Sequence, residues 1–529
     1  MASSSALRWL ERRLFDVVEA VPVLAVHANR ILINRAVGRA RTRPHPWSTA
    51  QPYTSWTALS DRSWSGRHLP PKPVADLPPV ETLTRLFARP EDRPADPDGK
   101  STCLFPAFAQ YLTDGFIRTL TEPLADRIGL SGLSDDELFR RTTSNHQIDL
   151  CPLYGRTPAQ TAALRQNSET PGERGRLKSQ TIDGEEYAPF LYRDGELDPQ
   201  FAVLDPVLGD GDGLAAEKRA TLFAFGGDRA NSVPQVAMLN TLFLREHNRL
   251  AGEIAQRHPD WDDTRVFETA RNVVIVLFIK IVVEEYINHI SPKNFSIRAD
   301  PRAAWRAAWN KPNWITTEFS LLYRWHALIP DAIPWGGGEP VPVARTFLDH
   351  GVLLRGGLLA AFRDISATPA TRLGLFNTTK RLLHVEERSI RQGRACQLAS
   401  YSDYRAYVGL DRPQRFEDVT SDPQAAEMLR RAYGSVDRIE FFVGLFAEDR
   451  TVNSSLPPLI LRFVAIDAFS QALTNPLLSE HVFKPETFSA PGWDAIQNTV
   501  SLRDLLARNT PGGIGETFVG MTRPEWDFV

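Results

Sequence analysis

Apolar residues recur at helical spacing along most of the chain. Within residues 233–256 they fall at intervals of three and four, which is typical of an amphipathic helix with one buried face. Residues 265–290 are apolar on nearly every side between Val273 and Val283, which predicts a buried helix because a strand of that length would be unusual. Helical spacing also marks residues 316–328, 344–364, 373–391 and 423–434. The sequence lacks the alternation typical of sandwiches or strand–helix–strand units, so we predict a mainly α-helical fold.

The amino-terminal segment is basic and amphipathic. Leucines and valines recur at helical spacing from Leu7 to Val21 with arginines among them, Pro22 interrupts the pattern, and a second apolar stretch extends to Ile33. Such a segment can lie in a membrane interface without crossing it. A pair of helices packed on the body of the protein explains the pattern equally well. We expect neither a secretion signal nor a spanning helix, because the longest apolar run falls short of the ~18 residues that spanning requires.

Changes in composition divide the chain into three parts. Residues 1–42 form the amphipathic segment, which we expect to be membrane-interface helices. Residues 43–100 are rich in Pro, Asp, Arg and Ser with little periodicity, so they predict an extended wrap or linker. Residues 101–529 carry the helical signals of a single catalytic domain, and we interpret their Gly- and Pro-interrupted part, 149–225, as long ordered loops.

Composition narrows the class of protein. Hydrophobic residues make up 42% and charged residues 24% of the 529 residues, which excludes a disordered or fibrous chain. The net charge is −3, so the basic footprint of a nucleic-acid-binding protein is absent. Cys103, Cys151 and Cys396 lack paired spacing, which predicts neither a zinc ribbon nor a disulfide framework. A reducing, cytoplasmic compartment is therefore expected.

Three short strings carry candidate chemistry. FAQYLTD spans residues 108–114, LREHNR spans 244–249, and LYRWH spans 322–326. Together they resemble the animal-type haem peroxidase superfamily, and within it the cyclooxygenase branch and its bacterial fatty-acid dioxygenase relatives. The resemblance extends over nearly the whole chain, from the amino-terminal helices to the KPETF string at 484–488. It does not include the disulfide-rich module of the animal cyclooxygenases, because three cysteines cannot build one.

The resemblance implies haem b as the cofactor, with His326 as the ligand of its iron. Tyr323 precedes His326 by three positions, so we expect both side chains on one face of a helix, one turn apart. In the resembling enzymes this tyrosine becomes a radical that removes hydrogen from a fatty acid, after which O2 adds to the carbon radical. Without the resemblance, a core histidine and a core tyrosine with a locally bonded hydroxyl would explain both residues.

The distal side of the expected haem site departs from the family pattern. Gln110 matches the distal glutamine, but Asp114 stands where the family has a histidine, a residue that titrates near neutrality. Arg229 stands where the myeloperoxidase-like members carry an arginine, and an Asp and Arg pair resembles dye-decolourising peroxidases. Three interpretations remain open: Asp114 acts as the acid and base, it weakens peroxide activation, or the protein no longer needs peroxide activation. A residue on the helix surface, with no role in the chemistry, is a fourth explanation of Asp114. We favour weakened activation.

Three further positions bear on the resemblance to the haem peroxidase family. Phe442 stands at a position that looks like a cyclooxygenase tyrosine, so one secondary radical site or proximal hydrogen-bond partner would be absent. Gly115 follows Asp114 where calcium-binding peroxidases often carry Asp, so we expect no calcium. His247 lies in the most recognisable string, but that segment supports the haem pocket in the family, so we assign it no chemistry.

Four residues are candidates for binding a fatty acid. Arg35 resembles the cyclooxygenase arginine that meets the carboxylate, a group that matches the guanidinium fork. Lys293 replaces a family tyrosine and would add a second positive charge near the same mouth. Phe319 and Leu322 flank Tyr323 and would line the acyl channel. Ordinary surface cations and core packing explain these residues as well.

The sequence therefore favours a haem-dependent fatty-acid dioxygenase that uses a tyrosyl radical to give a hydroperoxide or related oxylipin. We expect a bacterial, cytoplasmic protein held peripherally on a membrane by its amino-terminal helices, and a homodimer is one of the assembly states left open. One alternative is a haem peroxidase or peroxygenase that uses Asp114 as its distal acid and base. Another is a non-catalytic, haem-binding, membrane-associated sensor.

Overall fold

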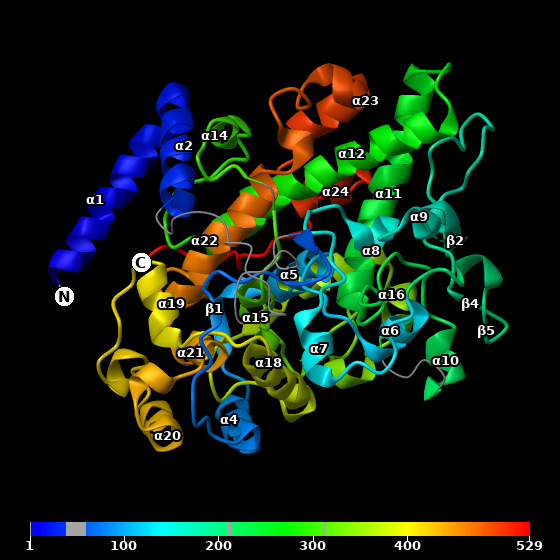
Figure 1. Cartoon of the computed structure of the whole chain (residues 1–529). Helices are drawn as coiled ribbons and strands as arrows, with labels where there is room; N and C mark the ends of the chain where they lie inside the picture. Colours follow the sequence, from blue (N-terminus) through cyan, green and yellow to red (C-terminus); the bar gives the residue numbers. More distant parts are fainter. Residues whose placement is uncertain (1, 39–59, 209–212, 312) are drawn as a thin grey trace.

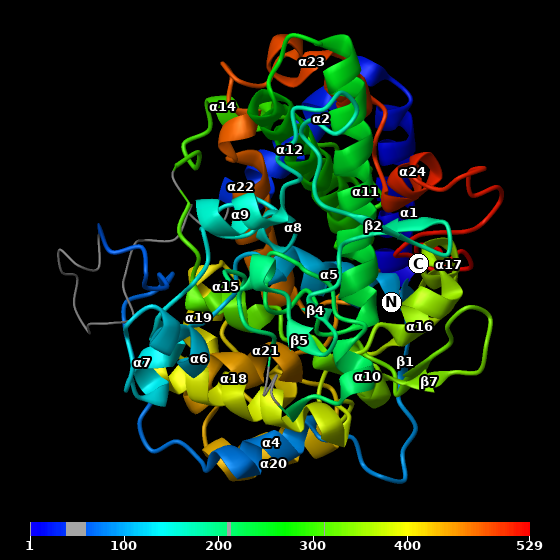
Figure 2. The same cartoon turned by 90° about the vertical axis from the view of Figure 1, so that its right-hand side faces the viewer.

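Two long helices form the centre of the protein. In the computed structural model, which describes residues 2–38, 60–208, 213–311 and 313–529, α11 (Pro234–Arg257) packs along α12 (Asp263–Ile281). Figures 1 and 2 show both helices running through the body of the molecule. The chain continues from α12 through a π-helical turn, η3 (Val282–Ile287), into α13 (Asn288–Ile290). The two strongest helices predicted from the apolar pattern are thus confirmed, the second with a local irregularity.

Local sequence explains where these helices begin. Pro234 occupies the first turn of α11, where its missing N–H leaves no hydrogen bond unmade. Asp262 caps α12, because its side chain accepts a hydrogen bond from the Arg265 backbone N–H at 2.7 Å. The apolar run of α12 is buried on all sides, and α23 packs over it. Burial of a helix that is apolar all round is what the sequence predicts.

Shorter helices surround this centre. Before α11 the chain forms α1 (Ala2–Glu19), α2 (Pro22–Gly38), α4 (Val80–Phe87), α5 (Leu104–Asp114), α6 (Glu122–Arg127), α7 (Asp135–Arg140), α8 (Cys151–Tyr154), α9 (Pro158–Leu164), η1 (Pro199–Phe201) and α10 (Ala216–Arg219). After α13 it forms α14 (Arg302–Trp305), α15 (Thr317–Leu322), η4 (His326–Leu328), η5 (Val343–Arg345), α16 (Gly351–Gly356), α17 (Leu358–Ala367), η6 (Lys380–Leu382) and α18 (Leu383–Ala395). The carboxy-terminal part contains α19 (Tyr401–Tyr407), η7 (Phe416–Asp418), α20 (Pro423–Tyr433), η8 (Val436–Arg438), α21 (Phe441–Ala447), α22 (Pro458–Leu473), η9 (Pro476–Leu478), α23 (Pro485–Gln497) and α24 (Leu502–Arg508).

Strands are few and short. The described ranges contain four two-stranded antiparallel sheets. They pair β1 (Pro97–Thr102) with β8 (Pro369–Thr371), β2 (Gln180–Ile182) with β3 (Glu185–Tyr187), β4 (Tyr192–Arg193) with β5 (Glu196–Leu197), and β6 (Ala332–Ile333) with β7 (Val341–Pro342). The mainly α-helical prediction is confirmed. The segment 149–225 contains short helices and hairpins among its loops, and α4 lies inside the segment expected to be a linker, of which residues 43–59 lie outside the described chain.

The amino-terminal helices lie against one side of the body (Figure 1). On α1 the ring of Phe15 packs against Phe295 at a centroid distance of 5.4 Å. On α2 the buried side chains of Ile33 and Val37 face the body, and the helix packs against α14 and α22. Among the residues that the structure describes, no helix is both long enough and apolar enough to cross a bilayer.

The prediction that one helix contains both Tyr323 and His326 is wrong. α15 begins at the Thr316 cap and ends at Leu322, and His326 starts the separate 3-10 helix η4. The aromatic side chains account for the turn between them, because the Trp325 ring stacks on Tyr323 at 4.7 Å and packs against Phe105 of α5 at 5.3 Å. The chain thus leaves the helical conformation after Leu322, and its aromatic side chains pack against the distant helix α5.

Candidate active site

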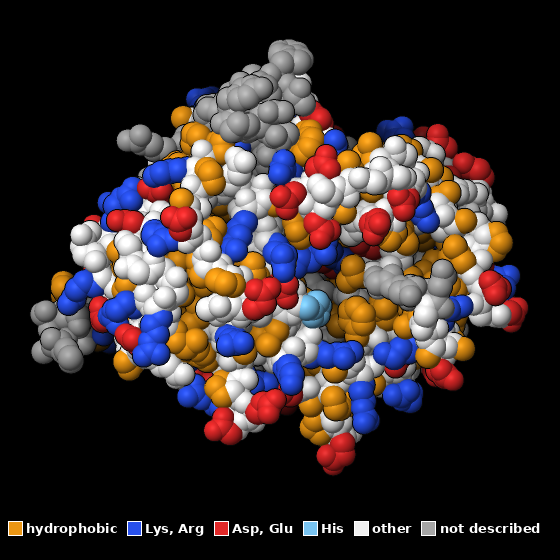
Figure 3. All heavy atoms as spheres, turned by 60° about the horizontal axis from the view of Figure 1, so that its bottom comes forward, with side chains coloured by type: hydrophobic (Ala, Val, Ile, Leu, Met, Phe, Trp, Pro, Cys, Tyr) orange, Lys and Arg blue, Asp and Glu red, His pale blue; other side chains and the backbone are white. Residues whose placement is uncertain are grey.

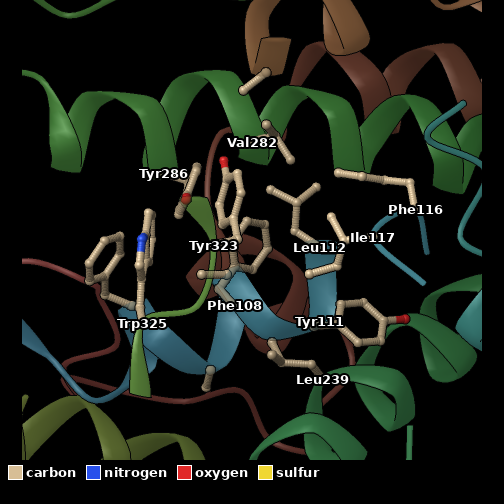
Figure 4. Close-up of a cluster of buried hydrophobic side chains, with 14 of the residues drawn as sticks. Phe108, Tyr111, Leu112, Phe116, Ile117, Leu239, Val282, Tyr286, Tyr323 and Trp325 are labelled. Carbon is tan, nitrogen blue, oxygen red and sulfur yellow. The ribbon is translucent and has the colours of Figure 1, made fainter. Parts of the chain in front are cut away.

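Tyr323 lies at the end of α15 in a cluster of buried apolar side chains (Figure 4). Its ring packs edge-on against Phe319 at 4.9 Å and stacks on Trp325 at 4.7 Å. Phe319 in turn stacks on Phe116 at 5.3 Å, and Leu322 is fully buried. The sequence candidates Phe319 and Leu322 therefore lie beside Tyr323 in an apolar environment.

The hydroxyl groups of Tyr323 and Tyr286 are close together within this cluster. Tyr286 projects from η3 toward Tyr323, and each phenol affects the pKa of the other (Figure 4). Within the described chain, neither hydroxyl makes a hydrogen bond of ordinary geometry. Burial raises the pKa of Tyr323, Tyr286 opposes this shift, and Asp467 adds to it. Tyr323 is consequently a neutral phenol whose O–H has only a weak neighbour.

His326 pairs with a carboxylate. Its side chain is 19% exposed, and its Nδ1 lies 3.2 Å from Oε1 of Glu386 on α18. The Glu386 side chain is 2% exposed, and the same oxygen accepts a hydrogen bond from the Thr378 hydroxyl at 3.1 Å. With Nδ1 directed to Glu386, Nε2 is the nitrogen of His326 left to bind a metal.

Helix α5 brings Gln110 and Asp114 onto one face, four residues apart. Gln110 donates a hydrogen bond from Nε2 to Oγ of Ser232 at 2.9 Å. Asp114 is only 4% exposed, and its Oδ2 has no hydrogen-bond partner in the part of the chain that the structure describes. The surface position that the sequence left open for Asp114 is therefore excluded.

The charge environment of Asp114 favours proton exchange near neutrality. Burial raises the pKa of Asp114 to about 7. The positive charge of Arg229 opposes this shift, Asp228 reinforces it, and Arg118 and Arg324 oppose it. Asp114 and Arg229 thus lie in the same electrostatic neighbourhood. A carboxyl group with a pKa close to 7 can both donate and accept a proton at physiological pH.

Sequence reasoning does not single out Arg324, although it stands inside the LYRWH string. Loss of hydration lowers the pKa of Arg324 to about 9, and Arg229 and Arg388 push in the same direction. Glu386 and Asp114 oppose this shift. Arg324 therefore interacts electrostatically both with Asp114 of α5 and with Glu386, the partner of His326. The signal that could have identified it is a cation placed in the sequence between the two candidate site residues, Tyr323 and His326.

Several buried polar atoms around Arg324 indicate a ligand site. Within the described residues, no hydrogen-bond partner is present for Oδ2 of Asp114, Nε of Arg324, Oε2 of Glu386 and Nε2 of Gln392. Buried polar atoms are normally satisfied, so this concentration fits a polar ligand between α5, α15 and α18. The cations favour a ligand with negative charge, and Nε2 of His326 can bind a metal. An iron porphyrin with two carboxylate groups provides both.

The surface is consistent with such a ligand. Figure 3 shows the face that carries α4, α18 and α20 in Figure 1, and this face is hollowed near its centre. A histidine side chain is visible in the hollow, and Lys and Arg side chains lie around it, with Asp and Glu side chains on one side. Basic side chains at the rim of a hollow favour a ligand with carboxylates at its edge.

The LREHNR string of α11 has a structural role. His247 is fully buried, with Nδ1 2.9 Å from the Tyr154 hydroxyl and Nε2 2.8 Å from the Gly175 carbonyl oxygen. Burial lowers the pKa of His247 to about 3, so its ring is neutral. Glu246 accepts a hydrogen bond from the Asn509 side chain at 2.7 Å. The string therefore ties α11 to the loops before it and to the segment after α24.

The structure does not bring Arg35 and Lys293 into one binding site. A groove of about 1280 Å³ lies between α2, the loop after α13 and α23. Its lining includes Lys293, Arg30 and Lys280 but not Arg35, which is exposed on α2. Lys293 also forms an ion pair with Glu11 of α1.

Most of the chain is similar to known proteins. The family described as animal haem peroxidase matches residues 116–517. Prostaglandin G/H synthase 1 of Rattus norvegicus is 31% identical over 502 residues, which cover 90% of this chain and 78% of the relative. Prostaglandin G/H synthase 2 of Equus caballus is 28% identical over 513 residues, covering 94% of this chain and 79% of the relative.

Solved structures share the fold at lower identity. The fatty acid alpha-dioxygenase of Oryza sativa is 18% identical with a TM-score of 0.68, and the match covers 100% of this chain and 98% of that one. Peroxidase A of Dictyostelium discoideum is 20% identical with a TM-score of 0.65, covering 91% of this chain and 96% of that one. At these identities the likeness establishes the architecture.

Proposed function

Because the chain belongs to the animal haem peroxidase family and is an oxidoreductase, we propose that it is a haem b-dependent fatty-acid dioxygenase. As a phenoxyl radical, Tyr323 would remove a hydrogen atom from an acyl chain, and O2 would add to the carbon radical. The peroxyl radical would then take a hydrogen atom back from the Tyr323 phenol, which gives a hydroperoxide or related oxylipin and restores the phenoxyl radical. The observation that carries this proposal is the buried Tyr323 hydroxyl, which has no ordinary hydrogen-bond partner in the described chain and lies among apolar side chains. A phenol without a strong partner is free to exchange its hydrogen with a substrate.

Residues on two sides of the site would hold the cofactor. His326 would bind iron through Nε2, and Arg324 and Arg388 would meet the carboxylates of the porphyrin. When bound, haem supplies the oxidising power that converts a phenol into a phenoxyl radical. Trp325 packs between Tyr323 and Phe105 and keeps the phenol in a fixed position three residues from His326.

The apolar cluster suits an acyl chain. Phe319 packs on the Tyr323 ring, Phe116 stacks on Phe319, and Leu322 is fully buried; these side chains contribute no polar atoms. Such surroundings exclude water and hold a hydrocarbon by apolar contact. The substrate class is supported by the Oryza sativa enzyme, a fatty acid alpha-dioxygenase with the same architecture.

Gln110, Asp114 and Arg229 are proposed to manage peroxide. Asp114 holds or releases a proton at Oδ2, since its pKa of about 7 lets both forms exist at neutral pH. Arg229 stabilises negative charge near that proton. We expect peroxide activation to be slower than with a distal histidine. Burial raises the pKa of Asp114, so a large fraction of the molecules carries a protonated carboxyl group that cannot accept a proton at neutral pH.

The amino-terminal helices are proposed to seat the protein on a membrane surface. One side of α1 packs on the body through Phe15, and Glu11 pairs with Lys293. The other side is apolar and solvent-exposed, with side chains exposed by 56–66% at Leu7, Trp9, Leu10, Leu14 and Val17. An amphipathic helix of this kind binds a lipid interface by burying its apolar face. Lys293, which lines the groove between α2 and α23, is the remaining candidate to meet the fatty-acid carboxylate on this side of the molecule, because Arg35 lies outside that lining.

Oxygen uptake tests the function. Haem-loaded protein is mixed with saturated and unsaturated fatty acids and a trace of peroxide, alongside Tyr323→Phe and the matched control Tyr433→Phe. Tyr433 is buried and donates its hydroxyl hydrogen bond to Glu440 at 2.9 Å, so the control loses a phenol elsewhere. Uptake that disappears only in Tyr323→Phe supports the dioxygenase.

A second candidate function is a haem peroxidase that uses Asp114, favoured by the pKa of about 7 at this carboxyl group. Peroxide consumption without oxygen uptake in the same assay would identify it. A haem spectrum that responds to a gas or lipid without product would identify the sensor.

A further inference from the structure

The side chain of His326 contacts a buried carboxylate, that of Glu386. Its Nδ1 is 3.2 Å from Oε1 of Glu386, and both groups belong to segments joined only by tertiary packing. Glu386 projects from α18, whose first turn follows η6. The same Oε1 accepts the Thr378 hydroxyl at 3.1 Å, while Oε2 has no hydrogen-bond partner within the described chain. A buried carboxylate is thus aimed at the ring nitrogen opposite the one that would bind iron.

We propose that Glu386 is the proximal positioning residue of the haem site. It accepts the Nδ1–H hydrogen bond of His326, fixes the ring with Nε2 toward the metal, and draws proton density away from the imidazole. Histidines that bind metals almost always donate their other N–H to a carboxylate, a carbonyl or water, which orients the ring and raises its basicity. This inference rests on the proposed function, because it requires His326 to ligate haem iron.

The charge of Glu386 distinguishes this arrangement from simple orientation. A neutral acceptor would orient His326 equally well, but a carboxylate makes the imidazole a stronger electron donor. A stronger donor favours the ferric iron over the ferrous iron and lowers the reduction potential of the haem. Arg324 lies close enough to feel Glu386, so the negative charge is partly balanced within the site.

The sequence left the proximal hydrogen-bond partner of His326 open. Phe442 on α21 stands at a position that looks like a cyclooxygenase tyrosine, and its ring stacks on Phe87 at 5.4 Å. A phenylalanine offers no acceptor for Nδ1–H. Glu386 on α18 supplies the acceptor instead.

Spectroscopy of the haem-loaded protein tests the proposal. The ferrous iron–histidine stretching frequency and the reduction potential are measured for the parent, Glu386→Gln and the control Glu387→Gln. Glu387 is the neighbouring acid and pairs with Arg391 at 2.8 Å on a more exposed face of α18. We expect Glu386→Gln to shift the stretching frequency downward and the potential upward, and Glu387→Gln to leave both unchanged.

A second variant keeps the test decisive if Glu386→Gln does not fold. Thr378→Val removes the hydroxyl that shares Oε1, so the carboxylate should bind Nδ1–H more strongly. We therefore expect the opposite shifts, a higher stretching frequency and a lower potential. Glu386→Asp should restore part of the parent signature if it folds.

The outcomes separate this inference from the proposed function. A parent protein with an iron–histidine band that is unchanged in both Glu386→Gln and Thr378→Val overturns the role of Glu386 and leaves His326 as the ligand. A parent without such a band, or one whose band survives in His326→Ala, overturns the ligand assignment itself. Opposite shifts in the Glu386 and Thr378 variants support the proposal.

Discussion

His68 and Asp467 form a buried pair, with Nε2 of the histidine 3.0 Å from Oδ2 of the aspartate. Their side chains are 0% and 4% exposed. Burial opposes a charge on His68, but Asp467 and Glu318 together raise the pKa of His68 above its usual value. The negative charge of Asp467 also raises the pKa of Tyr323, so this pair is part of the electrostatic environment of the candidate radical site.

The His68–Asp467 pair predicts a pH-dependent stability. The folded state holds the His68 proton more tightly than the unfolded state, whose histidine titrates near 6.5. Its contribution is therefore complete below about pH 6.5 and declines as pH rises through the folded-state pKa. Asp467→Asn should lower the free energy of unfolding at pH 6 by about 3–5 kcal/mol and flatten this decline. Urea denaturation across pH checks both effects, and equal slopes in the two proteins would contradict the assignment.

Asp114 predicts a step in the pH profile of peroxide consumption. Burial raises the pKa of Asp114 to about 7, and a base must be deprotonated to accept a proton. The rate in haem-loaded protein should therefore increase as pH rises through about 7. Asp114→Asn should remove the step and reduce the rate by roughly 100-fold, whereas Asp114→His should accelerate activation. A step that persists in Asp114→Asn belongs to another group and rejects this role.

Arg324 predicts a specific loss of haem affinity. Its guanidinium loses hydration and is close to Arg229 and Arg388, so it gains most from an anionic ligand. Replacing it in Arg324→Met removes one charge-assisted hydrogen bond and should weaken haem binding about tenfold. Titration of haem at its Soret band measures this, with Arg391→Met as a control that removes an arginine from the more exposed face of α18. The prediction fails if both variants bind haem as tightly as the parent.

His247 predicts a defect in stability without a defect in chemistry. His247→Phe leaves the Tyr154 hydroxyl and the Gly175 carbonyl unpaired in a fully buried site. Each such group costs about 1–3 kcal/mol, so the variant should unfold at a clearly lower temperature. Its haem spectrum at low temperature should match that of the parent. An altered spectrum in the folded variant would instead link the LREHNR string to the haem site.

The apolar side of α1 predicts binding to lipid vesicles. Leu10 and Leu14 are exposed by 56% and 61%, and burying a leucine stabilises binding by roughly 1.5–3 kcal/mol. A double variant that carries Leu10→Asp and Leu14→Asp should therefore bind vesicles more than 100-fold more weakly, as measured by co-sedimentation. Ile128→Asp is the matched control, because Ile128 is 55% exposed on another part of the surface. Equal binding by all three proteins would argue against the membrane assignment.

Local patterns determined the helical fold and the positions of the main site residues. The helices α11 and α12 were predicted because their apolar periodicity and length are properties of the local sequence. The FAQYLTD and LYRWH strings located Asp114 and His326 by family resemblance. By contrast, α22 was not predicted, because its buried residues include the polar Asp467, Ser470 and Gln471, so no unbroken apolar run marks it.

Tertiary packing decided the chemistry around these residues. The sequence predicted one helix through Tyr323 and His326, but the contact between Trp325 and Phe105 requires the chain to leave α15 before that point. Glu386 is 60 residues from His326. Asp467 is 399 residues from His68. Neither pairing follows from spacing along the chain, because a side-chain hydrogen bond depends on how distant helices pack. Burial, which turns Asp114 from an ordinary carboxylate into a group that titrates near neutrality, is likewise set by the surrounding fold and not by its neighbours in sequence.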